Sequence, residues 1–262
     1  MVSIFTIVNL VVSVILIFAA PLLFFYYFRS KKGMFRTMAA GAMGFFIAQY
    51  VLRIPILNNV LSSSDFSFIL DDVLLYALLL GVSAAALELL FRIIILKWFM
   101  ADYQQKHHVL SAGFGHGLIE AIFLVALTYI NNIILSIYIN NNNIDQLFDQ
   151  ASDVGAINQV VQGLINTSSW VFLLGGLERI MVLIIHVAVT IVVFKGLKNK
   201  NQRLKLWGFA FVFHASLDVA IVLMQLSNTS IWLMEGLILI FALISVKIVV
   251  EYIKEKPIKE QT

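Results

Sequence analysis

Hydrophobic residues form seven long runs along the chain, separated by short polar clusters. Each run reaches about 20 residues, the length that a helix needs to cross the hydrocarbon core of a bilayer. Backbone N–H and C=O groups cannot stay unpaired in lipid, so these runs predict helices rather than open strands. The predicted spans cover residues 3–28, 37–60, 70–98, 109–138, 168–195, 206–226 and 231–251.

Charged residues alternate in sign between successive loops. Basic residues follow the first, third, fifth and seventh spans, for example Lys32, Lys106 and Lys198. The other loops carry mainly acidic residues, such as Asp72 and Asp145. Because basic loops stay in the cytoplasm, this pattern predicts an N-terminus outside and a C-terminus in the cytoplasm.

The chain shows no internal repeat, linker or second domain, so one integral membrane domain over residues 1–262 is expected. Its polar core is expected on helices within residues 70–226. The Asn-rich stretch 140–167 predicts an external loop with a short surface helix around 144–164. Arg53 near Pro55, at the outer end of the second span, suggests an anchor that reaches to the interface.

Composition supports an all-α polytopic protein of the cell membrane. Of 262 residues, 61% are hydrophobic and 13% are charged, whereas a soluble domain has about 25% charged residues. The absence of cysteine excludes disulfides, a thiol nucleophile and thiolate metal sites. A net charge of only +3 and the lack of a basic tract with interleaved aromatics argue against nucleic acid as a partner.

Several ionisable residues lie inside the predicted spans, where they are expensive and therefore suggest function. The candidate site residues are Glu88, Arg92, His116, Glu120, Glu178, Arg179, His186, His214 and Asp218. Three pairs among them are four residues apart, which puts both side chains on one helix face. Counted from the expected cytoplasmic ends, most of these acids and histidines lie about 12–18 Å deep at 1.5 Å per residue. They are therefore expected to form one polar layer.

The residue types in this layer fit more than one chemistry. Glu88 suits a general base that takes a proton from water, or a structural ion pair with Arg92. His116 and His214 suit donors to an oxyanion, zinc ligands, or histidines bonded to Glu120 and Asp218. The H-E-x-x-H signature of zinc proteases is absent from the sequence. Three glycines around His116 allow a close helix approach or a local helix break.

The order of these motifs resembles a known family. Glu88-x-x-x-Arg92, then His116, then His214-x-x-x-Asp218 is similar to the layout of the CAAX-protease and bacteriocin-processing superfamily. The stretch 113–120 (GFGHGLIE), followed by Glu178-Arg179 and His186, more closely resembles the bacterial YhfC family, which is grouped with glutamic-type intramembrane proteases.

The resemblance implies a glutamate-activated water that attacks a peptide carbonyl, without a metal or other cofactor. Glu88 would be the base, Arg92 its partner, and His116, His214 and Asp218 the groups that stabilise the oxyanion and water. The substrate would be a membrane-associated peptide or protein in the lipid bilayer.

One position departs from the superfamily pattern, which opens with two adjacent glutamates. The first of these corresponds to Leu87 here, so Glu120 and Glu178 stay open as alternative bases. Three other functions also stay open: a proton-coupled transporter or channel, an inactive membrane scaffold, and a zinc protease that uses the same histidines.

Overall fold

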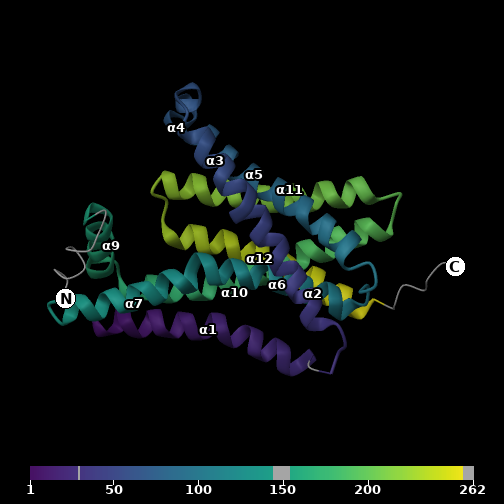
Figure 1. Ribbon diagram of the computed structural model, residues 1–262, viewed down its shortest axis with the longest axis horizontal. Coiled ribbons are helices and arrows are strands. Elements are labelled where there is room, and N and C mark those ends of the chain that lie inside the picture. Colours follow the sequence, from purple (N-terminus) through teal and green to yellow (C-terminus); the bar gives the residue numbers. More distant parts are fainter. Residues whose placement is uncertain (29, 144–153, 256–262) are drawn as a thin grey trace. The chain divides into compact units, whose positions relative to one another are not determined.

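The computed structural model describes residues 1–28, 30–143 and 154–255, and these fold as helices joined by short loops (Figure 1). Within these ranges, seven helical stretches are long and apolar enough to cross a membrane, which confirms the predicted number of spans. Most of the predicted spans stop one to three residues short of the corresponding helical stretch, at one end or at both. The stretches are α1 (Ile4–Phe28); α2, η1 and α3 (Met34–Phe46, Ile47–Arg53, Ile54–Leu61); α5 and η3 (Val73–Ile94, Ile95–Phe99); α6, η4 and α7 (Lys106–Ala121, Ile122–Ala126, Leu127–Asn140); α10 (Ser169–Lys198); α11 (Arg203–Leu226); and α12 (Ile231–Lys254).

Shorter elements occupy two of the loops. Between the second and third spans lie η2 (Ser64–Phe66) and α4 (Ser67–Asp71). The carboxylate of Asp72 accepts hydrogen bonds from the N–H groups of Leu74 and Leu75, at 2.8 and 3.0 Å, and so caps α5. This cap starts α5 at Val73 rather than at residue 70. The helix α9 (Val154–Asn166) matches the second half of the predicted surface helix, and its first half, 144–153, lies outside the described residues.

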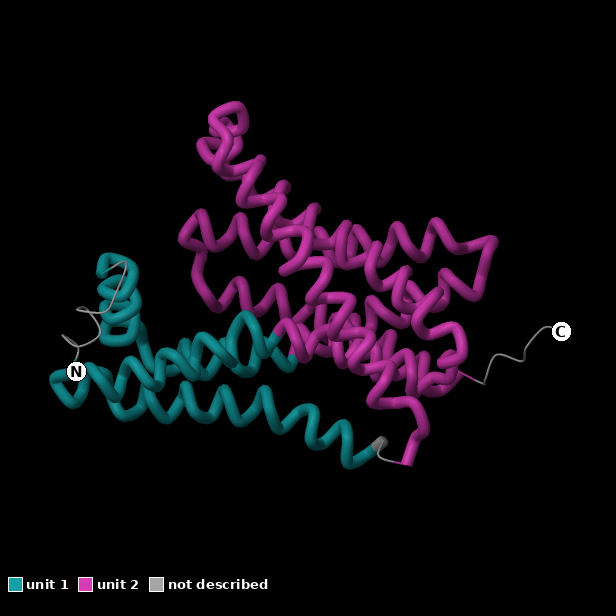
Figure 2. Tube along the Cα trace, in the orientation of Figure 1, with its two compact units in different colours: residues 1–27, 121–180 teal, residues 28–120, 181–262 magenta. Residues whose placement is uncertain are grey.

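The chain divides into two compact units (Figure 2). Unit 1 comprises residues 1–27 and 121–180, and contains α1, η4, α7, α9 and the first part of α10. Its core joins Leu10 of α1 to Leu164 of α9, with Tyr129 of α7 and Phe172 of α10 packed against them. Polar side chains of α1 are also paired, since the Ser13 hydroxyl donates to the Phe172 carbonyl at 2.8 Å.

Unit 2 comprises residues 28–120 and 181–262, and it contains the other spans. Within it, α5 and α11 pack side by side in opposite directions (Figure 1). This unit also contains α2, η1, α3, η2, α4, η3, α6, α12 and the second part of α10.

Glycines let α6 approach its neighbours closely. A Cβ added at Gly115 would overlap the carbonyl oxygen of Met38 on α2, and one at Gly41 would overlap the carbonyl oxygen of Ala112. Gly113 faces the backbone of Val187 on α10 in the same way, at 2.7 Å from an added Cβ. α6 runs without a break through these positions. Of the two possibilities in the sequence, the glycines therefore serve close packing.

Basic loop residues gather at one end of unit 2. The Lys106 ammonium donates to the carbonyl oxygen of Ile253 at 2.8 Å, and Lys195 pairs with Glu255 at 2.5 Å. Lys198 donates to the side chain of Gln104. The ends of α6, α10 and α12 therefore meet, as alternating basic loops require.

We expect this basic end to face the cytoplasm, and cysteine labelling tests that orientation. The chain has no native cysteine, so the maleimide can label only the single cysteine that each variant introduces. In intact cells, a membrane-impermeant maleimide should label Ser64→Cys, in the acidic loop, and should label Asn201→Cys only after the membrane is permeabilised. The reverse pattern would contradict the orientation.

A pair of glycine substitutions tests the close packing. Gly115→Ala should lower the free energy of unfolding by about 1–3 kcal/mol, the usual range for overpacking. Gly236→Ala on α12 is the control, because an added Cβ there meets nothing within 4 Å. Thermal unfolding in detergent measures both, and equal melting temperatures for the two variants would contradict this account.

Candidate active site

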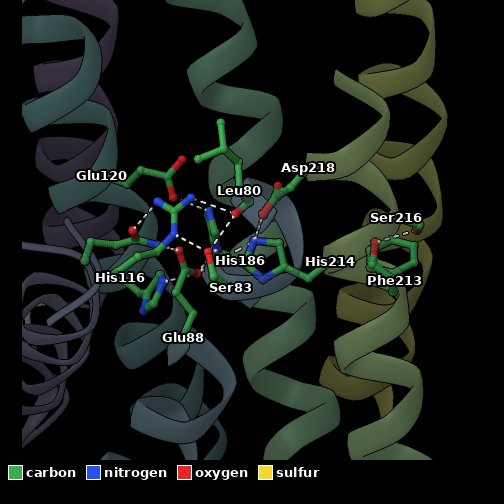
Figure 3. Close-up of polar contacts among 12 residues, drawn as sticks. Leu80, Ser83, Glu88, His116, Glu120, His186, Phe213, His214, Ser216 and Asp218 are labelled. Carbon is green, nitrogen blue, oxygen red and sulfur yellow. Dashed lines mark hydrogen bonds and ion pairs between the residues drawn. The ribbon is translucent and has the colours of Figure 1, made fainter. Parts of the chain in front are cut away.

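Seven of the nine predicted site residues lie together in unit 2 (Figure 3). They come from four helices: Glu88 and Arg92 from α5, His116 and Glu120 from α6, His186 from α10, and His214 and Asp218 from α11. The sequence places them far apart, and only the packing of the helices makes them one cluster. We call these seven residues the polar cluster.

The carboxylate of Glu88 is the centre of the polar cluster. Its Oε2 atom accepts hydrogen bonds from His116 Nε2 at 2.9 Å and from Arg92 Nη2 at 3.2 Å. His214 Nε2 lies 3.7 Å from the same oxygen, and His186 Nδ1 lies at 4.0 Å. Figure 3 shows Glu88 between the rings of His116 and His214. Glu88 is only 3% exposed, so its charge depends on these neighbours rather than on water.

Arg92 determines the tautomer of His186. Its Nη2 atom lies 2.6 Å from His186 Nδ1. Because a guanidinium group has donors only, Nδ1 must accept, and the ring proton of a neutral His186 lies on Nε2. That atom faces Glu120 Oε2 at 2.5 Å. Arg92 thus connects Glu88 to a second carboxylate through one imidazole.

Exposure increases across the polar cluster from Glu88 to Asp218. The side chain of Glu88 is 4% exposed, that of Glu120 is 12%, and that of Asp218 is 30%. Asp218 lies 3.3 Å from His214 Nε2, so this histidine stands between the most exposed carboxylate and the most buried one. Asp218 is therefore the most exposed of the three carboxylates, and the buried His214 separates it from Glu88.

A small cavity adjoins the buried side of the polar cluster. Arg92 and His116 line it, together with Gly41, Gly44 and Thr190. Its volume of about 10 Å³ is near the lower limit for one water molecule. The Nε and Nη1 atoms of Arg92 are buried and have no protein partner among the described residues, so donors are available to such a water.

Two contributors to this site were not predicted from the sequence. Gln49 Nε2 donates to Glu88 Oε1 at 2.6 Å, and Arg53 Nη1 donates to Gln49 Oε1 at 2.9 Å. The interpretation of Arg53 as an interface anchor is wrong, because Arg53 also donates inwards to Ser83 Oγ at 2.9 Å. The sequence feature that could have indicated this pair is their spacing of four residues in an otherwise apolar span.

Widened helical turns lie beside several of these residues. The π-helical segment η1 carries Gln49 and Arg53. The π-helical segments η3 and η4 begin three residues after Arg92 and two residues after Glu120. Such segments are rare and are frequent at functional sites.

The other two predicted residues, Glu178 and Arg179, belong to unit 1 and form an ion pair with each other. The contacts given above for the polar cluster all join residues of unit 2. A catalytic role for Glu178 or Arg179 stays a prediction.

The donors at the centre are of the kind that zinc takes. Glu88, His116 and His186 each offer one ligand atom, and these atoms lie within 4.8 Å of one another. Two imidazole nitrogens and one carboxylate oxygen form a known zinc ligand set. The residues therefore fit such an ion. Arg92 contacts two of these three residues, Glu88 and His186, so a dication there requires the guanidinium to move aside.

These features define a polytopic membrane protein with a buried acid–histidine centre. The family model described as "YhfC intramembrane metalloprotease" matches residues 14–239, so the chain belongs to the YhfC family and its class is that of the intramembrane proteases. It is 26% identical over 230 residues to "Uncharacterized membrane protein YhfC" of Bacillus subtilis (strain 168), which covers 86% of this chain and 87% of that protein. No solved structure matches.

The family assignment confirms the predicted resemblance to the YhfC family and the multi-pass membrane location. It favours a protease over the transporter and the inactive scaffold. Its description names a metal-dependent enzyme, whereas the sequence suggested a glutamic one.

Loss of Arg92 tests how the buried charge is compensated. Arg92→Met should destabilise the protein by about 3–5 kcal/mol, because it leaves the Glu88 carboxylate buried without its cation. The double variant Glu88→Gln/Arg92→Met should be more stable than Arg92→Met alone. Lys195→Met, which breaks an exposed pair with Glu255, is the control and should change stability by less than about 1 kcal/mol. Thermal unfolding that ranks the double variant below Arg92→Met would contradict this account.

Proposed function

We propose that this intramembrane protease is of the glutamic type, with Glu88 as the general base that activates the attacking water. One observation carries the proposal. Glu88 Oε2 and His214 Nε2 are 3.7 Å apart, which is too far for a direct hydrogen bond and close enough for both to contact one water molecule. The same His214 Nε2 atom lies 3.3 Å from Asp218, the most exposed carboxylate of the polar cluster.

The polar cluster supplies each group that peptide hydrolysis needs. Glu88 removes a proton from the water as the water oxygen bonds to the carbonyl carbon of the scissile peptide, and the carbonyl π electrons move to its oxygen. His214 donates a hydrogen bond to that oxyanion. The proton held by Glu88 then passes to the leaving nitrogen as the C–N bond breaks. The products are a carboxyl group and an amine.

The remaining groups keep the base charged and oriented. His116 and Arg92 both donate to Glu88 Oε2 and stabilise its ionised form. Asp218 lies beside His214 Nε2 and favours a proton on that nitrogen, which is the donor that the oxyanion requires. Glu120 holds His186 by the same principle.

A metal-dependent variant is the second candidate, and the grouping of Glu88, His116 and His186 favours it. A bound divalent ion would polarise the scissile carbonyl and make water more acidic. In that arrangement Glu88 is a ligand, and Glu120 becomes the carboxylate available as a base. Its side chain is 12% exposed and adjoins His186.

Proteolysis by the purified protein in detergent tests both candidates. The probes are labelled casein and quenched-fluorescent apolar peptides of about 20 residues, long enough to cross a bilayer. Glu88→Gln should lower kcat by about 10²- to 10⁴-fold, the usual contribution of a general base. His214→Ala should also lower kcat strongly, and Glu251→Gln, an exposed glutamate on α12, is the matched control.

Metal content and a chelator separate the two candidates. Activity that survives 1,10-phenanthroline in metal-free protein supports the glutamic mechanism. Activity that disappears with the chelator and returns with zinc supports the second candidate. Full activity in Glu88→Gln contradicts both, and parallel Glu120→Gln and Glu178→Gln variants would then identify the base.

A further inference from the structure

Both carboxylate oxygens of Glu88 accept hydrogen bonds, and the bond to Oε1 comes from a residue outside the polar cluster. While Oε2 faces His116, Arg92 and His214, Oε1 accepts a hydrogen bond from Gln49 Nε2 at 2.6 Å. Gln49 is 7% exposed and lies on η1, a different span from Glu88. A short bond to a buried amide fixes the rotation of the Glu88 carboxylate.

Arg53 dictates which end of the Gln49 amide faces Glu88. Its Nη1 atom lies 2.9 Å from Gln49 Oε1. A guanidinium group offers donors only, so the amide must turn its oxygen to Arg53 and its NH₂ group to Glu88. A flipped amide would point its oxygen at the carboxylate and lose both bonds.

Arg53 is itself anchored on the helix that carries Glu88. Its Nη2 atom donates to the carbonyl oxygen of Leu80 at 2.6 Å, and its Nε atom donates to Ser83 Oγ at 2.9 Å. Figure 3 labels Leu80, Ser83 and Glu88 on the same stretch of the chain, α5. The hydrogen-bonded path therefore leaves α5, crosses to η1 and returns to α5 at Glu88.

Gln49 and Arg53 lie together in the π-helical segment η1. The N–H of Ile54 bonds to the carbonyl of Gln49, the five-residue step of a π-helix. Pro55 follows directly and has no N–H for the preceding turn, which favours the wider helix. Residues four apart lie on one face of a helix, and Gln49 and Arg53 both contact α5.

We propose that Arg53 and Gln49 are positioning residues that orient the Glu88 carboxylate for its reaction. Arg53 acts through Gln49, and Gln49 acts through Glu88. Neither residue is assigned contact with the substrate. The proposal rests on the proposed function of Glu88 as a reacting group.

A kinetic double-mutant cycle tests this path in the full chain. Gln49→Met keeps the side-chain length, Arg53→Met keeps the unbranched apolar stem, and both remove the hydrogen bonds. Each should lower kcat by about 10- to 100-fold, the range for residues that orient a reacting group, and should leave KM within about twofold. The double variant should be no slower than Gln49→Met alone, because Arg53 acts through Gln49. Arg53→Lys keeps a donor and should recover part of the loss.

The controls use the same substitutions at exposed positions of unit 2. Gln225→Met on α11 and Arg36→Met on α2 should retain wild-type kcat. Losses that multiply in the double variant, or a loss that falls on KM, would overturn the proposal. A loss of kcat that parallels the drop in melting temperature equally in the Gln49 and Arg53 variants and in the control variants would also overturn it.

A wrong assignment of Glu88 can be told apart from a wrong assignment of Gln49 and Arg53. If Glu88→Gln retains full activity, or the wild type cleaves neither probe, the assignment of Glu88 fails. The hydrogen bond between Gln49 and Glu88 is then tested by thermal unfolding of Gln49→Met, Glu88→Gln and their double variant. Non-additive melting temperatures support the contact between Gln49 and Glu88, and additive ones overturn it as well.

Discussion

Burying one carboxylate in the middle of a membrane protein is the constraint on which this structure depends. An ionised group away from water costs several kcal/mol unless nearby charges and hydrogen bonds compensate it. Glu88 is 3% exposed and receives donors from Gln49, Arg92 and His116. These donors come from three separate spans, so charge compensation and helix packing are the same requirement.

That requirement explains the glycines of α6. A direct bond of 2.9 Å between His116 and Glu88 needs α6 to lie close to its neighbours. Gly115 removes the Cβ that would meet the backbone of α2, and Gly113 removes the one that would meet α10. Because α10 is drawn in by the same contacts, His186 reaches both Arg92 and Glu120. The glycine stretch thus brings two histidines to the centre at once.

Much of this arrangement follows from the sequence alone. Lipid forces each span to satisfy its own backbone, so long apolar runs determine helices locally. The spacing of four predicted that Glu88 and Arg92 share a face, and their observed pair has that geometry. Gln49 was not predicted because an uncharged amide in a span gives a weak signal. The two units could not be predicted either, since their boundaries fall inside continuous helical stretches at residues 120–121 and 180–181.

The contacts of Arg92 connect the two mechanisms. The polar cluster contains the carboxylates of Glu88, Glu120 and Asp218, whereas the guanidinium groups nearby are those of Arg92 and Arg53. A divalent ion at Glu88 would provide the positive charge that Arg92 provides now, beside two of the same residues, Glu88 and His186. Two cations at those donors would repel each other in a low-dielectric site. Arg92 and a metal are therefore alternatives at Glu88. With Arg92 in place the carboxylate is free of metal and suits the base proposed above, whereas with a metal in place another acid would have to act as the base.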